Sequence, residues 1–404
     1  MKILLIIADG LGDRPFGLLD GKTPLEAASK PNLNKLAKEG MIGLIDPIMS
    51  GIIPGSDTSH LNYLGYDPFK YYTGRGPFEA MGTGLKLRGG DVAFRANFAT
   101  VDENGVVIDR RAGRIREGTS ELARPLNMKI DDVEIFFKEG TEHRAALVLR
   151  GEGITTDVSD NDPHAENKKP NEIVATTEDG KKTARILNEF YRRSLDILKS
   201  QPLNSKRRSE GMKEANAILY RGGGSVPKLP NFNEKYSLKG GYVAAVALVS
   251  GICRLVGLKD FTPNGVTGST DTDVKAKFNS AVEALKEVDF VLVNVKGTDI
   301  AGHDGNGIEK RDFIERIDNA LGETVMKARD GLVICFTGDH STPASVKEHT
   351  SDPVPILLSY PGCRRDGVGE FDEINAKDGY LRLKGNDLMN VLLSSANRAE
   401  KYGA

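Results

Sequence analysis

Three carboxylates and three imidazoles combine residue types and spacings that could hold metal ions. They lie in or beside short polar loops near apolar runs, and they are Asp9, Asp299, His303, Asp339, His340 and His349. Mixed oxygen and nitrogen ligands suit Mn²⁺ or Zn²⁺, and a set without cysteine argues against an iron–sulfur or structural zinc site. Six or seven ligands are too many for one ion and about right for two, roughly 3.5–4 Å apart.

Each of these residues taken alone has an ordinary explanation. An aspartate after a strand usually caps a helix or a turn, and a histidine four residues after an aspartate, as in KGTDIAGHDG, can arise by coincidence. The convergence counts for more, because the chain has six histidines and four of them lie in polar loops of this kind. The set therefore predicts a site for two divalent ions.

A cluster of hydroxyls in the segment IPGSDTSHLNYLGYDP raises a second chemical question. Ser56 could simply cap the helix that follows it. Alternatively, it could be a nucleophile, because a helix N-terminus favours negative charge and a nearby divalent cation lowers the pKa of a hydroxyl. Thr58 and Ser59 are less well placed for this role. His60 is either a core residue or a support for the metal ligands.

Polar residues in the middle of the chain could bind an anion. Arginine recognises phosphate and carboxylate with paired hydrogen bonds, and the segment DRRAGR concentrates three arginines. A solvated surface is the alternative for any one arginine, but the cluster favours binding. The candidate substrate-binding residues are Arg110, Arg111, Arg114, Arg144, Asp160, His164 and, from outside this region, Lys239.

Short apolar runs alternate with helical periodicity along most of the chain, which predicts strands buried on both faces of a mostly parallel sheet sandwiched by helices, an α/β fold. Strands are predicted at 3–8, 242–249, 290–295, 331–338 and 353–359. Helices are predicted at 24–39 with a break at Pro31, 272–287, 308–328 and 386–401. Ligands of such sheets bind beyond the carboxyl ends of the strands, which is where the acids and imidazoles follow three of these runs.

Residues 88–175 depart from this pattern, with several short β-like pieces, polar turns and many arginines. They predict an inserted, smaller α+β domain that binds substrate and acts as a lid, within a core formed by 1–87 and 176–404. Residues 181–210 predict an amphipathic helix followed by a basic loop. The stretch YRGGGSVPK lacks the spacing of a phosphate-binding loop and predicts an ordinary glycine-rich connection.

The bulk composition excludes several classes of function. The chain has 404 residues, 39% of them apolar and 28% charged, with a net charge of −2, so neither nucleic acid nor an anionic membrane is the expected partner. Its three cysteines lack metal-type spacing, and its apolar runs are too short for a signal peptide or a membrane span. We expect a cytoplasmic protein acting on a small molecule, and the sequence allows a homo-oligomer.

Six segments together resemble one known family. IIADGLGDRP, PGSDTSHLNYLGYDP, DRRAGRI, GTDIAGHDG, TGDHSTP and EHTSDPVP are similar to motifs of the cofactor-independent phosphoglycerate mutases, most closely the short archaeal type, in the alkaline phosphatase superfamily. The resemblance implies interconversion of 3-phosphoglycerate and 2-phosphoglycerate without 2,3-bisphosphoglycerate, through a phosphoserine on Ser56.

The resemblance also implies a division of the metal ligands. One ion would bind Asp299, His303 and His349. The other ion would bind Asp9, Ser56, Asp339 and His340. Ser56 would then be both a ligand and the nucleophile.

The sequence departs from the long bacterial form of the family in two respects. That form has asparagine before the serine and Glu-Val-Gly after it, whereas this chain has Gly55 before it and Asp57-Thr58-Ser59 after it, and the inserted domain here is much shorter. Two other functions stay open: a metal-dependent phosphomonoester hydrolase or a mutase for another phosphorylated metabolite, and a metal-binding protein without catalysis. An inserted lid that excludes water would favour the mutase, because it protects a phosphoserine from hydrolysis.

Overall fold

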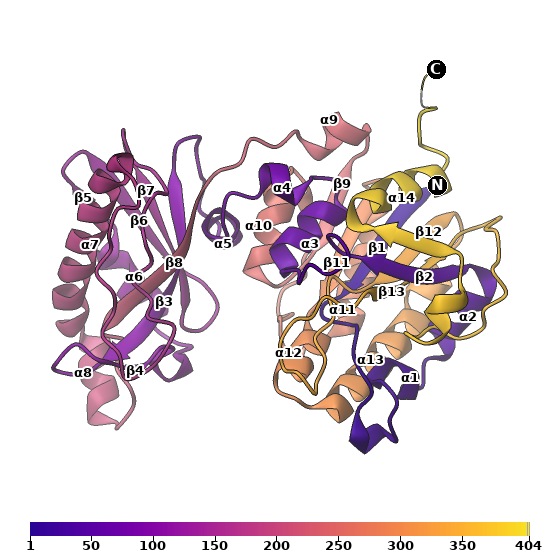
Figure 1. Ribbon diagram of the computed structural model, residues 1–404, viewed down its shortest axis with the longest axis horizontal. Helices are drawn as coiled ribbons and strands as arrows, with labels where there is room; N and C mark the ends of the chain where they lie inside the picture. The colour runs from indigo at the N-terminus through magenta and orange to yellow at the C-terminus, as the bar shows by residue number, and fades with distance from the viewer. Residues whose placement is uncertain (402, 404) are drawn as a thin grey trace. The chain divides into compact units, whose positions relative to one another are not determined.

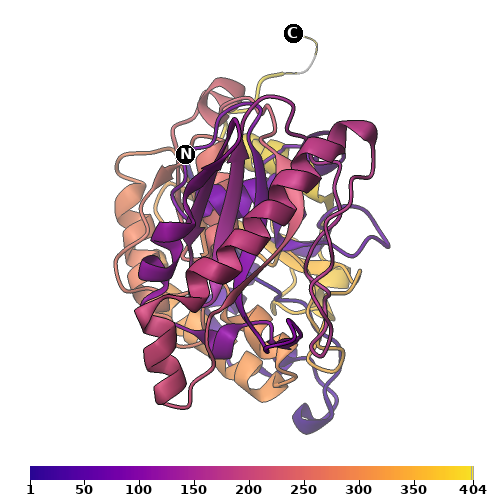
Figure 2. The same ribbon diagram turned by 90° about the vertical axis from the view of Figure 1, so that its left-hand side faces the viewer.

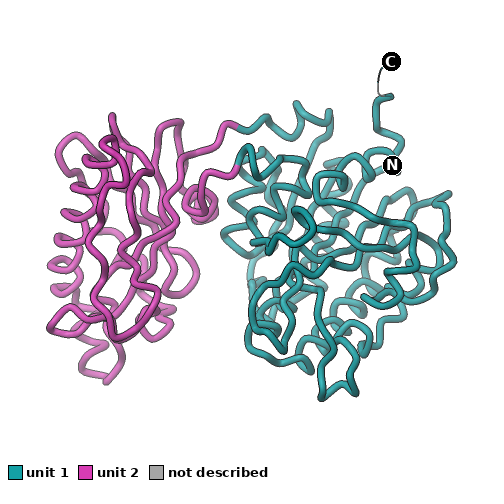
Figure 3. Tube along the Cα trace, in the orientation of Figure 1, with its two compact units in different colours: residues 1–71, 229–404 teal, residues 72–228 magenta. Residues whose placement is uncertain are grey.

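The computed structural model describes residues 1–401 and 403, and the chain divides into two compact units (Figure 3). The larger unit contains Met1–Tyr71 and Leu229–Ala404, and the smaller unit contains Tyr72–Lys228. The smaller unit therefore extends beyond the predicted insert, 88–175, at both ends. The reason is that a long helix and a further strand after residue 175 pack into its core.

An eight-stranded sheet forms the centre of the larger unit, in the order β10-β9-β11-β1-β12-β13-β2-β14. All neighbouring strands pair in parallel except β13, which runs antiparallel to β12 and β2. The strands are β1 (Lys2–Ala8), β2 (Met41–Asp46), β9 (Gly240–Val243), β10 (Lys259–Asp260), β11 (Phe290–Val295), β12 (Leu332–Thr337), β13 (Val354–Ser359) and β14 (Leu381–Lys384). The predicted parallel-rich α/β sheet is confirmed.

Helices pack on both faces of this sheet (Figure 1), so its central strands are buried throughout. They are α1 (Pro24–Ala27), α2 (Pro31–Glu39), α3 (Ser56–Tyr63), α4 (Pro68–Tyr71), α9 (Phe232–Tyr236), α10 (Ala247–Leu255), α11 (Val274–Ala284), α12 (Gly297–His303), α13 (Gly307–Glu323) and α14 (Leu388–Ser395). The predicted break at Pro31 is present, because proline starts α2 at its first turn.

Two element predictions in the larger unit were incomplete. The apolar run 242–249 is a strand only to Val243, and α10 begins at Ala247. A run that is apolar on every side gives no periodicity, so a strand and a buried helix look alike there. Strand β2 was not predicted, because Gly43 interrupts its apolar pattern; a Cβ on Gly43 would lie 2.5 Å from the main-chain carbon of Leu381 on β14.

A six-stranded antiparallel sheet forms the smaller unit, in the order β4-β3-β7-β6-β5, with β8 also paired to β3. Its strands are β3 (Val92–Val101), β4 (Val107–Asp109), β5 (Met128–Ile130), β6 (Val133–Glu139), β7 (Arg144–Arg150) and β8 (Ala217–Ser225). Its helices are α5 (Gly76–Gly82), α6 (Thr119–Ala123), α7 (Lys181–Lys199) and α8 (Pro202–Ser209). The segment predicted as a basic loop after α7 is therefore largely helix α8.

Helix α7 crosses one face of this sheet (Figure 2) and buries Phe190 against Phe137 and Tyr220. Helix α5 contacts β3, β7 and β8. The glycine-rich stretch predicted as a connection is largely part of strand β8. A Cβ on Gly224 would lie 2.7 Å from the carbonyl oxygen of Thr73, so these glycines allow the chain before α5 to approach the strand.

Among the described residues, no helix combines the length and the apolar character that crossing a membrane requires.

Candidate active site

Three parallel strands end at one edge of the larger sheet and place polar side chains there. Asp9 follows β1, Lys296 follows β11, and Asp339 with His340 follows β12. The main chain is packed closely at this edge: Gly10 has φ +67°, and a Cβ on it would lie 2.8 Å from the Cα of Asp299 in α12. The edge predicted from the strand ends is therefore the place where these residues meet.

Two further segments reach the same edge by other routes. His349 lies in the loop before β13, and because β13 is antiparallel its start is at the carboxyl edge of the other strands. Ser56 starts α3 after the loop 47–55 that follows β2. The His349 ring donates from Nδ1 to the carbonyl of Pro54 over 2.8 Å, which ties the two loops together.

The carboxylates and imidazoles form two groups of three. Within each group, the ligand atoms all lie within 4.8 Å of one another. The first group contains Asp299, His303 and His349, and the second contains Asp9, Asp339 and His340. The two groups adjoin, because His340 Nε2 is 3.9 Å from Asp299 Oδ1. This grouping is the division of ligands that the family resemblance implies.

Each histidine of the two groups turns its Nε2 toward the carboxylates. His303 donates from Nδ1 to the carbonyl of Lys347 over 2.9 Å, as His349 does to Pro54, and a carbonyl can only accept. Thr342 donates its hydroxyl to Asp299 over 2.8 Å, so it accepts from His340 Nδ1 at 2.9 Å. In the neutral form of each ring, the remaining nitrogen therefore carries a lone pair that can bind a metal ion.

These lone pairs and carboxylates need a cation between them. His303 Nε2 is 3.4 Å and His349 Nε2 is 3.6 Å from Asp299 Oδ1, so a proton or a metal ion is needed between each nitrogen and the carboxylate. Among the described residues, Asp339 Oδ2 is buried without a hydrogen-bond partner. The donor set thus fits two divalent ions by its chemistry as well as by its spacing.

One ammonium partly offsets the negative charge of this edge. Lys296 Nζ lies 2.9 Å from Asp9 Oδ1 and 2.7 Å from Asp299 Oδ2, so it bridges a carboxylate of each group. Burial opposes the ionisation of both carboxyls, but Lys296 holds the pKa of each below its ordinary value. The same pair raises the pKa of Lys296 against the effect of burial.

Ser56 is free of the capping role that was its ordinary explanation. The N-cap of α3 is Gly55, whose N–H donates to the Thr58 hydroxyl over 3.1 Å. The buried Ser56 Oγ instead lies 3.1 Å from His340 Nε2. When the ring is neutral this nitrogen only accepts, so the serine hydroxyl then donates its hydrogen to it and turns a lone pair away, as a nucleophile must.

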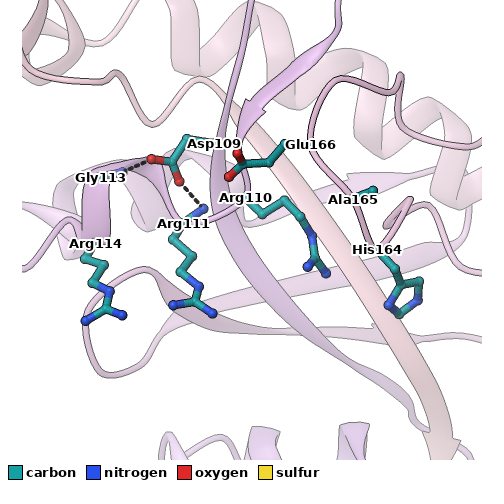
Figure 4. A pocket seen from close by; sticks show the side chains of 8 residues that line it. All are labelled: Asp109, Arg110, Arg111, Gly113, Arg114, His164, Ala165 and Glu166. Atoms are coloured by element: carbon teal, nitrogen blue, oxygen red, sulfur yellow. Dashed lines mark hydrogen bonds between the residues drawn. The ribbon is translucent and has the colours of Figure 1, made fainter. Parts of the chain in front are cut away.

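In the smaller unit, a cavity of about 480 Å³ gathers several of the predicted substrate residues. Figure 4 shows Arg110, Arg111, Arg114 and His164 extending to the same side of it. Asp109 accepts from the N–H groups of Arg111 and Gly113 and so shapes the turn.

The turn that carries these arginines has an uncommon main chain. Ala112 has φ 46° and Arg114 has φ 54°, on either side of Gly113 at 65°. Left-handed conformations cost about 1–3 kcal/mol at a residue other than glycine and concentrate at functional sites. The conformation favours a binding role for the turn over a solvated surface.

A second set of arginines, of which the sequence analysis predicted only Arg144, lies on one face of the smaller sheet. Arg95 on β3 pairs with Arg221 on β8, and Arg144 on β7 pairs with Asn97, two residues along β3. Paired residues, and residues two apart in a strand, project from the same face. Glu79 of α5 lies 3.9 Å from Arg95 Nε. The face therefore gathers three guanidiniums beside this carboxylate.

Burial and the neighbouring positive charges lower the pKa of one of these arginines, Arg95. Burial, together with the guanidiniums of Arg75, Arg144 and Arg221, lowers the pKa of Arg95 to about 9 against the attraction of Glu79. Among the described residues, Arg95 Nε is buried without a hydrogen-bond partner. Such a face can accept an anion at low cost, because the donors are already desolvated.

The other predicted residues of the smaller unit form a connected network. Arg110 donates to both oxygens of Asp162, which also pairs with Arg221 at 3.1 Å. Arg221 donates in turn to His164 Nδ1 over 3.0 Å. Asp160 accepts from the N–H of Gly222, and its burial raises its pKa. Arg110, Asp160 and His164 thus lie in one place.

Lys239 is the predicted residue that the structure does not bring to either place. It precedes β9 directly and therefore lies at the amino end of that parallel strand, opposite the edge that carries the metal groups. Its main chain pairs with Asp289 and Phe290. A position next to a strand does not by itself place a residue at the carboxyl end of that strand, where ligands bind.

The sequence also marks three residues of these two centres that are not among the predicted site residues. Lys296 follows a predicted strand directly, as the other edge residues do. Asn294 interrupts the apolar run FVLVNV, and Arg95 interrupts VAFRANFATV. A polar residue inside a buried strand is costly unless it is paired, so each of these interruptions marks a site.

A family model and individual relatives of known sequence carry the same description. A family model described as 2,3-bisphosphoglycerate-independent phosphoglycerate mutase matches residues 37–204. Proteins of that name from Picrophilus torridus and Saccharolobus solfataricus are 50% and 52% identical to this chain; the alignments cover all of this chain, and 100% and 99% of the two relatives.

Two solved structures share the fold over almost the whole chain. The cofactor-independent phosphoglycerate mutase from Thermoplasma acidophilum is 40% identical, with a TM-score of 0.71 over 98% of this chain and 100% of its own. A Pyrococcus horikoshii protein is also 40% identical, with a TM-score of 0.87 over 100% of this chain and 99% of its own. With relatives this similar over their full length, and with the serine, carboxylates and imidazoles assembled as described, the chain belongs to the family of 2,3-bisphosphoglycerate-independent phosphoglycerate mutases.

Proposed function

We propose that this protein interconverts 3-phosphoglycerate and 2-phosphoglycerate without 2,3-bisphosphoglycerate, through a phosphoserine on Ser56. Family membership supports the reaction. The observation that carries the mechanism is the buried Ser56 hydroxyl, which has no capping role and lies 3.1 Å from a ligand nitrogen of the second metal group.

The Ser56 oxygen loses its proton and attacks phosphorus, so a bond from Oγ to phosphorus forms while the bond from phosphorus to the glycerate oxygen breaks and that oxygen takes up a proton. The released glycerate then turns, and its other hydroxyl takes the phosphoryl group back from Ser56. Two divalent ions, Mn²⁺ or alternatively Zn²⁺, would be held by Asp299, His303 and His349 and by Asp9, Ser56, Asp339 and His340, and when bound they stabilise the negative charge of the reacting oxygens.

We propose that arginines of the smaller unit bind the phosphoglycerate. The candidates are Arg110, Arg111, Arg114 and Arg144, with Asp160 and His164 beside them. A bound glycerate that cannot leave, in a site that excludes water, distinguishes a mutase from a phosphatase. We place the reaction in the cytoplasm, in agreement with three cysteines that form no disulfide among the described residues.

The test is an enolase-coupled assay of the purified protein with 3-phosphoglycerate and Mn²⁺, without 2,3-bisphosphoglycerate, run beside Ser56→Ala. We expect wild-type turnover and a loss on the order of 10³-fold or more in the variant, because nothing else can carry the phosphoryl group. Trapping ³²P on Ser56 would identify the intermediate. Release of phosphate without 2-phosphoglycerate would instead indicate a hydrolase or a mutase for another metabolite.

A further inference from the structure

Two fully buried side chains join the nucleophile's helix to the first metal ligand. His60, one helical turn after Ser56, has its Nδ1 2.6 Å from the Ser56 carbonyl oxygen. Asn294 on β11 has its Nδ2 3.3 Å from His60 Nε2 and 3.0 Å from Asp9 Oδ2. A continuous path of hydrogen bonds therefore runs from the Ser56 main chain to Asp9.

The hydrogens of this path can be assigned from its ends. A carbonyl and a carboxylate only accept, so His60 Nδ1 donates to Ser56, and Asn294 Nδ2 donates to Asp9. His60 Nε2 then has no hydrogen and accepts the second N–H of Asn294. Turning the amide of Asn294 round would place its oxygen against two acceptors. Every bond of the path thus has one permitted direction.

The start of α3 needs such a tie more than the other site residues do. Asp9 follows its strand directly, whereas Ser56 is separated from β2 by the loop 47–55, and a loop does not hold a hydroxyl to a fraction of an ångström. The Tyr63 hydroxyl ties the far end of the helix to the carbonyl of Gly338 over 2.8 Å. At the end where Ser56 lies, the path through His60 adds a tie from within the helix to the one that His349 makes with Pro54.

We propose that His60 and Asn294 are positioning residues, which fix Ser56 Oγ and Asp9 relative to each other so that the second metal group is preformed. The proposal rests on the proposed function only where turnover is measured. Neither residue touches the reacting atoms. Both act through a neighbour, as residues behind the ligands of a metal site commonly do.

The first variant is Asn294→Leu, which keeps the branched shape of the side chain and removes both N–H donors. In the enolase-coupled assay we expect kcat to fall about 10- to 100-fold with little change in the KM for 3-phosphoglycerate. In titrations of the metal-free protein with Mn²⁺, we expect the affinity of one of two sites to fall about 10- to 100-fold and that of the other site to stay unchanged. The unaffected site is the one built on Asp299.

Two variants of His60 divide the path at its middle. His60→Asn keeps a donor near the Nδ1 position for the Ser56 carbonyl, and His60→Gln keeps an acceptor near the Nε2 position for Asn294. Each keeps one bond of the path and breaks the other, so we expect both to lose kcat and weaken the same Mn²⁺ site. Ser59→Ala is the matched control, because Ser59 is buried in the same helix and its hydroxyl has no hydrogen-bond partner among the described residues.

The outcomes separate positioning from mere packing. Normal kcat and both Mn²⁺ affinities intact in folded Asn294→Leu and His60→Gln would overturn the proposal. So would a fall in thermal stability with unchanged kcat per folded molecule. If Asn294→Leu does not fold, the two His60 variants decide alone. If the wild type lacks mutase activity, the proposed function fails, while the Mn²⁺ titrations still test the positioning role.

Discussion

The two polar centres of this chain carry unbalanced charges of opposite sign. At the edge of the larger sheet, three buried carboxylates, Asp9, Asp299 and Asp339, share the ammonium of Lys296. On the face of the smaller sheet, several guanidiniums gather near Glu79. One centre needs positive charge and the other needs negative charge, which are the two needs of an enzyme that uses metal ions to act on an anionic substrate.

The two centres also differ in how they are built. The metal groups lie at strand ends, and each histidine has a committed hydrogen, so the ligand atoms have little freedom. The arginine face is built from strand faces with long side chains, whose planar groups reach an anion in more than one pose. A reacting oxygen needs the first arrangement, and a glycerate that must turn between two attacks can use the second.

The largest expected effect comes from removing the carboxylate that three imidazoles face. In Asp299→Asn we expect loss of bound metal and a fall in kcat on the order of 10³-fold or more, because Asp299 Oδ1 is near both metal groups. Metal analysis after dialysis and the enolase-coupled assay measure the two effects. Asp304→Asn is the control, since Asp304 is exposed at the end of the same helix. Retention of two ions in Asp299→Asn would contradict the assignment of the groups.

A smaller effect is expected on the arginine face, and it should appear in a different constant. In Arg95→Met we expect the KM for 3-phosphoglycerate to rise about 10- to 100-fold, the worth of a charge-assisted hydrogen bond, while bound metal stays unchanged. Arg192→Met is the control, because Arg192 pairs with Glu189 on the exposed side of α7. An unchanged KM would mean that the excess charge on this face has no part in substrate binding.

This difference in construction explains which parts of the site could be predicted. Asp339 and His340 could be predicted as candidate metal ligands because they lie just after a strand whose apolar run shows its end, and one edge collects all such ends. The face of Arg95 was not predictable, because it depends on the register of β3 against β8, and β8 was interpreted as a glycine-rich connection.

The fold, like the site, was predictable where a continuous apolar run marks a buried strand, and not predictable elsewhere. The continuous apolar runs of β1, β11 and β12 identified the core of the larger sheet. The extent of the smaller unit was not predictable, because α7 is amphipathic and would cover either sheet equally well. Only its packing of Phe190 against Phe137 assigns it to the smaller one.

The smallest expected effect is the change in the free energy of unfolding with pH, and this change has opposite signs in the two units. In the smaller unit, burial and the neighbouring Arg144 lower the pKa of His143 to about 4. In the larger unit, burial raises the pKa of Glu373 to about 7, against the hydrogen bond from Thr23. The ordinary values are 6.5 and 4.5, so each group titrates differently in the folded and unfolded chains.

The signs follow from which state binds the proton. Between pH 6.5 and 4 the unfolded chain protonates His143 and the folded chain does not, so this contribution to stability is present above pH 6.5 and is lost as the pH falls. Glu373 stays protonated in the folded chain, so its contribution is present below pH 4.5 and is lost as the pH rises through 7. Each slope is at most about 1.4 kcal/mol per pH unit.

Hydrogen exchange resolved by peptide, corrected for intrinsic rates, would measure the two units separately at pH 5 and pH 7. His143→Gln should flatten the slope of the smaller unit, and Glu373→Gln that of the larger; a change in both units from either variant would show that the two unfold together.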